Sequence, residues 1–126
     1  MDTLRIGKIS SVNYEQGTAR VLYTDRDNAV TAELPLLTGE GSMPNVDDLV
    51  LVCHLPNGAA AGVILGRFWN DNNRPTEGAA GLYRKDLDDG VYIRYEKGKK
   101  LQIVCEEGIE IKGDVKVDGN ITADNI

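Results

Sequence analysis

The sequence has few of the residues on which most enzymes depend. A single histidine, His54, occurs among 126 residues, and the chain has no P-loop, no Rossmann glycine pattern and no HExxH zinc motif. No serine or cysteine has a plausible base nearby. Acidic pairs occur at 47–48, 88–89 and 106–107, but adjacent side chains on a strand point to opposite faces, which makes them poor acid/base pairs. We therefore expect a protein that is not an enzyme and that holds no cofactor and no metal ion.

Long apolar runs and an excess of basic residues are also missing. No apolar run approaches the length of a membrane-spanning helix, and the N-terminus lacks the order of a signal peptide. The formal net charge is −6, made up of −4 in residues 1–80 and −2 in residues 81–126. A protein that binds nucleic acid or an anionic membrane would be expected to carry a basic patch on its surface. We therefore expect no nucleic-acid partner and no secretion by the usual route.

Cysteine occurs only twice. Cys53 and Cys105 lie in different segments, each in the apolar phase of an expected strand. Buried free thiols are more consistent with these positions than a disulfide or a metal pair.

The most informative feature that is present is an alternating pattern near the C-terminus. Between residues 101 and 124, nine of the twelve odd positions are apolar, whereas Val104 is the one apolar residue among the twelve even positions. A period of two places the apolar side chains on one face of extended chain. Gly108, Gly113 and Gly119 recur at spacings of five and six, which suits corners where strands bend around an axis. The segment is predicted to be β-structure with one dry face.

This dry face must be covered, and we expect the chain to supply no later segment that could cover it. Ordering so long a segment costs more free energy than burying its own side chains returns. Unpaired strand edges favour pairing with another chain, and identical segments around a shared axis would cover one another. We therefore predict that residues 91–126 form an obligate oligomerisation element and shaft. The residues expected at its interface are Leu101, Ile103, Cys105, Ile109, Ile111, Val115, Val117 and Ile121.

The first two-thirds of the chain is predicted to form five short strands. Their expected ranges are 5–12, 18–24, 29–34, 48–54 and 60–68. Turns are expected at 14–17, 25–28 and Asn57-Gly58, Pro35 closes the third strand, and residues 39–45 form a loop. Five strands with a break after the third match the oligonucleotide/oligosaccharide-binding barrel, the OB-fold. In such a barrel, His54 is expected to be a strand residue with a satisfied ring.

A polar, glycine-rich stretch that begins at Asn70 is predicted to be the domain boundary. The expected organisation is an OB-fold domain over 1–76, a linker over 77–90 and a β-helical shaft over 91–126. A hairpin formed by residues 90–95 and 100–104 leads into the shaft.

The order of these motifs resembles a known family. The segments in question are Arg5-Ile6-Gly7-Lys8-Ile9, Ala19-Arg20-Val21, Leu34-Pro35, Asp48-Leu49-Val50-Leu51-Val52, Asn57-Gly58 and Gly62-Val63-Ile64-Leu65-Gly66-Arg67-Phe68. The C-terminal segments are Asp89-Gly90-Val91, Gly108-Ile109-Glu110-Ile111 and Asp114-Val115-Lys116-Val117-Asp118-Gly119-Asn120-Ile121-Thr122-Ala123. Together they are similar to the phage baseplate assembly protein V family, which forms the central spike of contractile tails and related injection machines.

The resemblance implies an all-β homotrimer, with three OB-folds at the tail hub and three intertwined C-terminal segments forming a trimeric β-helix. It implies a location in the baseplate of a phage tail or tail-like particle, contact with hub proteins, and transient contact with the target cell envelope on sheath contraction. The eight interface residues would then line the trimer axis. Some members end in an apex that holds a metal ion through a His-x-His pair. The one histidine here is far upstream, so either the needle ends bluntly or a separate tip protein caps it near Ile126.

A second function class is an OB-fold binding module for nucleic acid or carbohydrate. Tyr14, Tyr23, Phe68 and Trp69 could stack on bases or sugar rings. The acidity of residues 1–80 and the absence of interleaved lysine and arginine argue against this function, and core packing accounts for the aromatic residues more simply.

Overall fold

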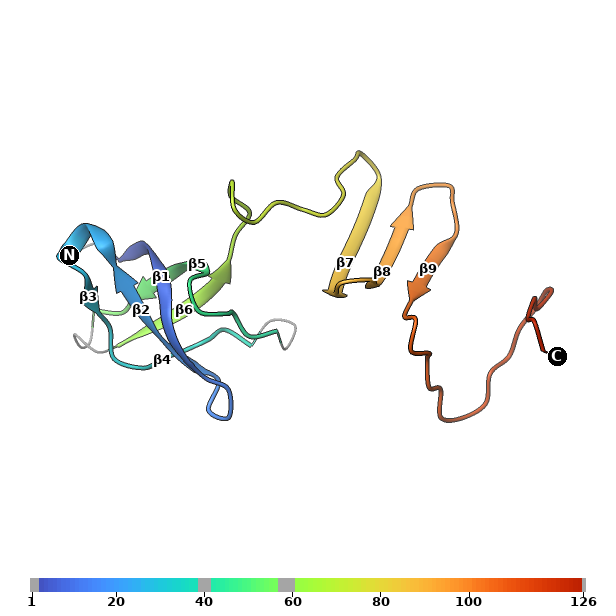
Figure 1. Cartoon of the computed structure of the whole chain (residues 1–126), viewed down its shortest axis with the longest axis horizontal. Helices are drawn as coiled ribbons and strands as arrows, with labels where there is room; N and C mark the ends of the chain where they lie inside the picture. Colours follow the sequence, from blue (N-terminus) through green and yellow to red (C-terminus); the bar gives the residue numbers. More distant parts are fainter. Residues whose placement is uncertain (1–2, 39–41, 57–60, 126) are drawn as a thin grey trace. The chain divides into compact units, whose positions relative to one another are not determined.

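The protein is all-β and divides into two compact units, Met1–Arg74 and Pro75–Ile126 (Figure 1). The computed structural model describes residues 3–38, 42–56 and 61–125. The expected turn at Asn57-Gly58 and residues 39–41 of the expected loop lie outside these ranges. All pairs between named strands are antiparallel, as expected where short turns join consecutive strands.

The described residues of the first unit form six strands and one short 3-10 helix. In chain order these are β1 (Leu4–Asn13), β2 (Thr18–Tyr23), η1 (Thr24–Arg26), β3 (Ala29–Val30), β4 (Leu34–Pro35), β5 (Leu49–His54) and β6 (Gly62–Arg67). The expected third strand, 29–34, is interrupted between β3 and β4. Thr31 causes the interruption, because its hydroxyl accepts the hydrogen bond of the Val21 amide at 3.0 Å in place of a backbone carbonyl.

The strands of the first unit form a sheet that closes on itself. The paired order is β3-β2-β1-β5-β6, and β4 pairs with β2 beside β3. Beyond β4, Leu36 forms a parallel bridge with Ile64 of β6, and the Leu37 amide donates to the Ile64 carbonyl at 2.9 Å. The chain after β4 therefore joins the far strand, β6, and completes a ring. Irregular register between Ile9 and Ser11 gives β1 the local bend that closure requires.

The core lies inside this ring. Its buried residues are Ile9, Ala19, Val21, Tyr23, Leu34, Val50, Val52 and Ile64, contributed by five of the six strands. Gly7 allows β1 and β2 to approach closely, because a Cβ atom there would collide with the side chains of Val21 and Tyr23. The alternation of apolar residues in the sequence thus marks the inner face of the ring.

The second unit begins with a three-stranded antiparallel sheet. Its strands are β7 (Leu82–Asp88), β8 (Val91–Glu96) and β9 (Leu101–Val104), in the order β7-β8-β9. The expectation of a linker over 77–90 needs correction, because β7 occupies half of that range. Four of the seven residues of β7 are charged; among them Arg84 pairs with Asp86 within the strand and with Glu77 outside it.

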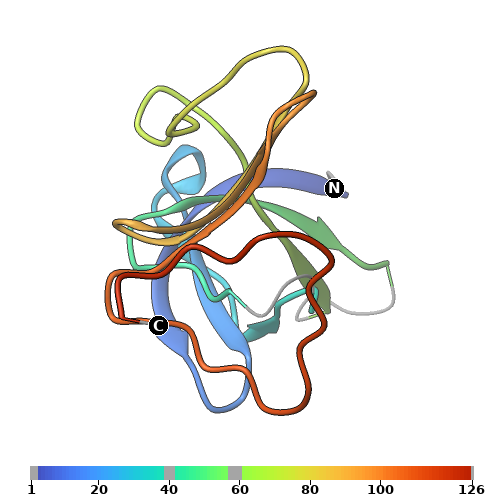
Figure 2. The same ribbon diagram turned by 90° about the vertical axis from the view of Figure 1, so that its right-hand side faces the viewer.

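The chain from Cys105 to Asn125 forms no strand or helix within the described residues. Its one backbone hydrogen bond there runs from the Gly108 amide to the Cys105 carbonyl, at 3.1 Å. The segment, dark orange to red in Figure 2, turns repeatedly and does not run straight. A strand needs a hydrogen-bonding neighbour, and within residues 105–125 the single chain offers none.

Candidate oligomerisation surface

The sheet of the second unit has one polar face whose charges are paired. Arg94 makes two hydrogen bonds to the Glu77 carboxylate, at 2.7 and 2.9 Å. Arg84 donates to Glu77 at 3.2 Å and to Asp86 at 3.0 Å, and its guanidinium stacks on the Tyr92 ring at 3.9 Å. The hydrogen bonds from Arg94, and then those from Arg84, lower the pKa of the Glu77 carboxyl to about 2. This face needs no further partner for its charges.

The opposite face of the same sheet is apolar and uncovered. Tyr83, Tyr95 and Leu101 stand directly opposite one another on β7, β8 and β9, and they are 58%, 41% and 61% exposed. Lys85, Ile93 and Ile103 form the next row, in which Ile103 is also exposed and Lys85 is the one charged residue. Exposed apolar surface of this extent marks a contact surface.

Seven of the eight residues expected at the interface are exposed in the single chain. They are Leu101, Ile103, Ile109, Ile111, Val115, Val117 and Ile121, with exposed fractions between 48% and 66%. The eighth, Cys105, is half-buried. The structure brings Leu101 and Ile103 together on the apolar face of the sheet, whereas the other six follow one another along the segment after β9.

Glycines mark the bends in this segment. Gly108, Gly113 and Gly119 have φ angles of 109°, 121° and 141°, which residues with a side chain rarely adopt. No other described residue lies within 4 Å of the Cβ position of these glycines, so their role is conformational and not one of close packing. The three pieces that follow these bends carry exposed odd-position apolar residues, namely Ile109 and Ile111, Val115 and Val117, and Ile121.

Sequence reasoning missed the contribution of β7 to this surface. Tyr83 belongs to the odd phase of the apolar face, and Arg84 belongs to the polar network. Five of the seven residues of β7 are charged or aromatic, which hid the period of two. The usable signal was the alternation of Tyr83 with Arg84, which matches that of Tyr95 with Arg94 opposite them.

His54 is a barrel residue with a satisfied ring, as expected. Its Nε2 atom lies 2.6 Å from the Tyr23 hydroxyl. The Arg5 guanidinium lies over the Tyr23 ring, 4.3 Å from the ring centroid. Burial raises the pKa of the Tyr23 hydroxyl.

Both cysteines are free, as predicted, but they are half-buried and not fully buried. Cys53 lies on the outer side of β5, where the chain's own core does not reach it.

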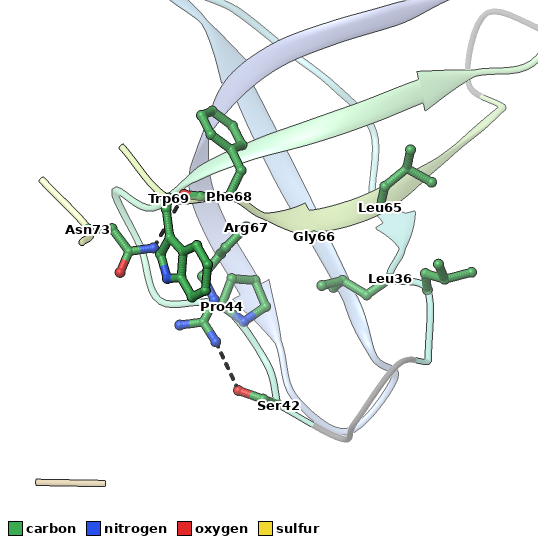
Figure 3. Close-up of a pocket in the computed structure, with 10 residues that line it drawn as sticks. Leu36, Ser42, Pro44, Leu65, Gly66, Arg67, Phe68, Trp69 and Asn73 are labelled. Carbon is green, nitrogen blue, oxygen red and sulfur yellow. Dashed lines mark hydrogen bonds between the residues drawn. The ribbon is translucent and has the colours of Figure 1, made fainter. Parts of the chain in front are cut away.

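A groove of about 670 Å³ lies on the outside of the first unit (Figure 3). Leu36 and Leu65 lie toward one end of it, and Trp69, which is 70% exposed, lies beside Pro44. We call it the Trp69 groove; its lining residues are Leu36, Leu37, Ser42, Pro44, Leu65, Gly66, Arg67, Phe68, Trp69 and Asn73. Of the four aromatic residues considered for stacking, Phe68 and Trp69 line this groove. Tyr23 is buried in the core, and Tyr14 lies outside the groove lining.

The described residues contain no group of three or more potential metal ligands, and no helix among them is long and apolar enough to cross a membrane. No family model matches the chain, and no curated protein matches it.

Proposed function

We propose that this protein is a structural spike component of a contractile injection machine, a homotrimer whose C-terminal segments intertwine into a rigid needle. The needle is driven into the envelope of the target cell when the sheath contracts. The role is mechanical and not catalytic, and the protein acts in the baseplate of a phage tail or tail-like particle.

One observation carries the proposal: residues 101–121 present a long series of apolar side chains that the described chain leaves uncovered. The backbone of residues 105–125 is similarly unpaired, with one internal hydrogen bond. Intertwining with two identical segments would pair the backbone groups and bury the side chains on a common axis. The bends at Gly108, Gly113 and Gly119 suit a chain that passes around such an axis.

The polar network of the second unit supports the same arrangement. Arg84, Arg94 and Glu77 satisfy one another on one face of the sheet, so that face remains in water. The apolar face, with Tyr83, Tyr95 and Leu101, then turns inward toward its copies. In the trimer, three such sheets form the base of the needle.

The closed ring of the first unit supports an OB-fold at the hub end. Five segments surround one core, and the chain after β4 crosses to lie parallel to β6, which matches a five-stranded Greek-key barrel. In this proposal the barrel contacts hub proteins, and the far end of the needle either is blunt or is capped by a separate tip protein.

The absolute mass of the full chain in solution tests the proposal. Light scattering coupled to size exclusion is expected to give about 41 kDa, three times the 13.7 kDa of one chain. A chain ended at Gly81 lacks the sheet and the segment after it, and is expected to give the mass of a monomer. A stable full-length monomer would refute the spike proposal.

The Trp69 groove favours one alternative, an OB-fold module that binds nucleic acid or carbohydrate. An exposed indole in a groove can stack on a base or a sugar ring. The groove is poor in free positive charge, because Arg67 lies 3.7 Å from the Asp48 carboxylate and donates to Ser42 at 3.0 Å. Measuring oligonucleotide binding at low and high salt distinguishes the spike from a nucleic-acid-binding module. The module must bind the oligonucleotide at least at low salt.

A further inference from the structure

Strand β5 is apolar on both of its faces. Residues Leu49 to Cys53 are five apolar residues in succession, and Val50 and Val52 are fully buried in the core. The intervening residues, Leu49, Leu51 and Cys53, face outward and are only half-buried. Strands that are apolar on both faces are normally covered on both. The described part of the chain covers only the inner face of β5.

The outward residues of β5 continue an apolar surface across the neighbouring strands. Leu4 and Val63 flank Cys53 on β1 and β6, and Ile6 lies opposite Leu51. Leu4 is 55% exposed and Ile6 is 57% exposed. We call Leu4, Ile6, Leu51, Cys53 and Val63 the outer stripe. It is an exposed apolar face built in register on three adjacent strands.

The Trp69 groove adjoins the outer stripe at β6. Leu65 lines the groove and lies two residues along β6 from Val63, at the point where the register with β5 shifts. The barrel thus carries two apolar patches of different shape, a flat stripe and a concave groove. A cyclic trimer requires two different surfaces on each copy, because each subunit contacts the next one head to tail.

We propose that the outer stripe of one barrel packs into the Trp69 groove of the next copy, so that the three barrels form a closed ring. This inference rests on the proposed trimer. A connection of seven residues, from Pro75 to Gly81, lies between the first unit and the first strand of the sheet, β7. It would hold the three barrels at an effective concentration on the order of millimolar.

The connection keeps a second copy close enough to be the occupant, and charge limits the surfaces through which two barrels can meet. Residues 1–80 carry six basic and ten acidic side chains, so two barrels repel one another over most of their surfaces. Charged side chains at both patches are paired. Arg67 in the groove lies 3.7 Å from Asp48, and Asp25, which lies beside Leu4, Ile6 and Leu51, is paired with Arg5 at 2.8 Å. These neutral patches are therefore where two barrels of like charge meet at the lowest electrostatic cost.

The test uses Trp69, the one tryptophan of the chain, as the reporter in the full-length protein. Acrylamide quenching is expected to be several-fold weaker in the native trimer than in the same protein in guanidinium. Ile6→Asp is expected to restore strong quenching, although Ile6 does not line the groove, while the mass stays that of a trimer. Val30→Asp is the matched control, since Val30 is 50% exposed on β3 outside both patches, and it is expected to leave the quenching weak.

Each outcome has a defined meaning. A trimer in which Trp69 is quenched as strongly as in guanidinium overturns the ring of barrels but leaves the proposed spike intact. Protection of Trp69 that survives both Ile6→Asp and Leu4→Asp also overturns it, since the groove would then have another occupant. A monomer would instead refute the proposed function itself. Circular dichroism of each variant verifies that the barrel remains folded.

Discussion

Replacing Ile111 with aspartate gives the sharpest test of the apolar segment. Ile111 is 66% exposed in the single chain, so most of its surface is available for burial between copies. Burying an isoleucine side chain is worth roughly 1.5–3 kcal/mol, and three copies together would lose roughly 4.5–9 kcal/mol. Since 1.4 kcal/mol corresponds to a factor of ten, association should weaken by at least about a thousandfold.

The introduced carboxylates add to this loss. Three of them would meet at the axis, where burying an unpaired charge costs far more than losing an apolar contact. We therefore expect Ile111→Asp to abolish the trimer at micromolar concentration, as measured by light scattering coupled to size exclusion.

Lys112→Asp is the matched control for this change. Lys112 is the next residue along the chain and belongs to the polar phase of the pattern. Lys112→Asp changes the net charge of the chain by two units, whereas Ile111→Asp changes it by one. Its exposed partner, Glu110, lies 3.5 Å from the Lys112 amine, and an exposed pair of this kind contributes little. Lys112→Asp should therefore remain trimeric. A full yield of soluble Ile111→Asp trimer, or equal disruption by both variants, would refute the assignment of the odd phase to the axis.

Three further predictions concern stability. Gly7→Ala should lower the unfolding free energy of the barrel by roughly 1–3 kcal/mol because its Cβ overlaps core side chains, whereas Gly78→Ala, which has open space, should have little effect in the same denaturant titration. Gly113→Ala should lower the thermal midpoint of the trimer, since φ is 121° and a strain of about 1–3 kcal/mol arises in each chain; an unchanged midpoint would mean that the bend is not kept on assembly. Because the pKa of Glu77 is lowered to about 2, its ionised form contributes stability that is present above about pH 4.3 and is lost as the pH falls toward 2. In melting curves the difference between wild type and Glu77→Gln should accordingly be largest near neutral pH and vanish near pH 2, and a difference that is constant with pH would contradict this role.

Much of the barrel follows from local sequence patterns. The alternation of apolar residues in β1, β2, β5 and β6 located the strands within one or two residues, because one side of each strand meets the core. The split between β3 and β4 did not follow from the pattern. It depends on the Thr31 hydroxyl, a side chain that can either leave the backbone ladder intact or replace part of it.

Residues with two possible environments were the hardest to predict. The charges of β7 are typical of a solvated loop, and only the pairing of Arg84 and Arg94 with Glu77 makes them part of a sheet. Cys53 was expected to be buried because it lies in an apolar run, yet that run has an outer face. A continuous apolar run in a strand shows that both faces are apolar, but it does not show what covers the second face.

The near absence of internal hydrogen bonds after β9 should make the ordering of that segment a later step than the folding of the barrel. The barrel forms from contacts within one chain, so its refolding rate should not depend on protein concentration. The segment from Cys105 onward has almost no contacts of its own to form, and in the proposed trimer it becomes ordered only when chains collide. Refolding should therefore show a fast first-order phase followed by a slow phase that accelerates with concentration.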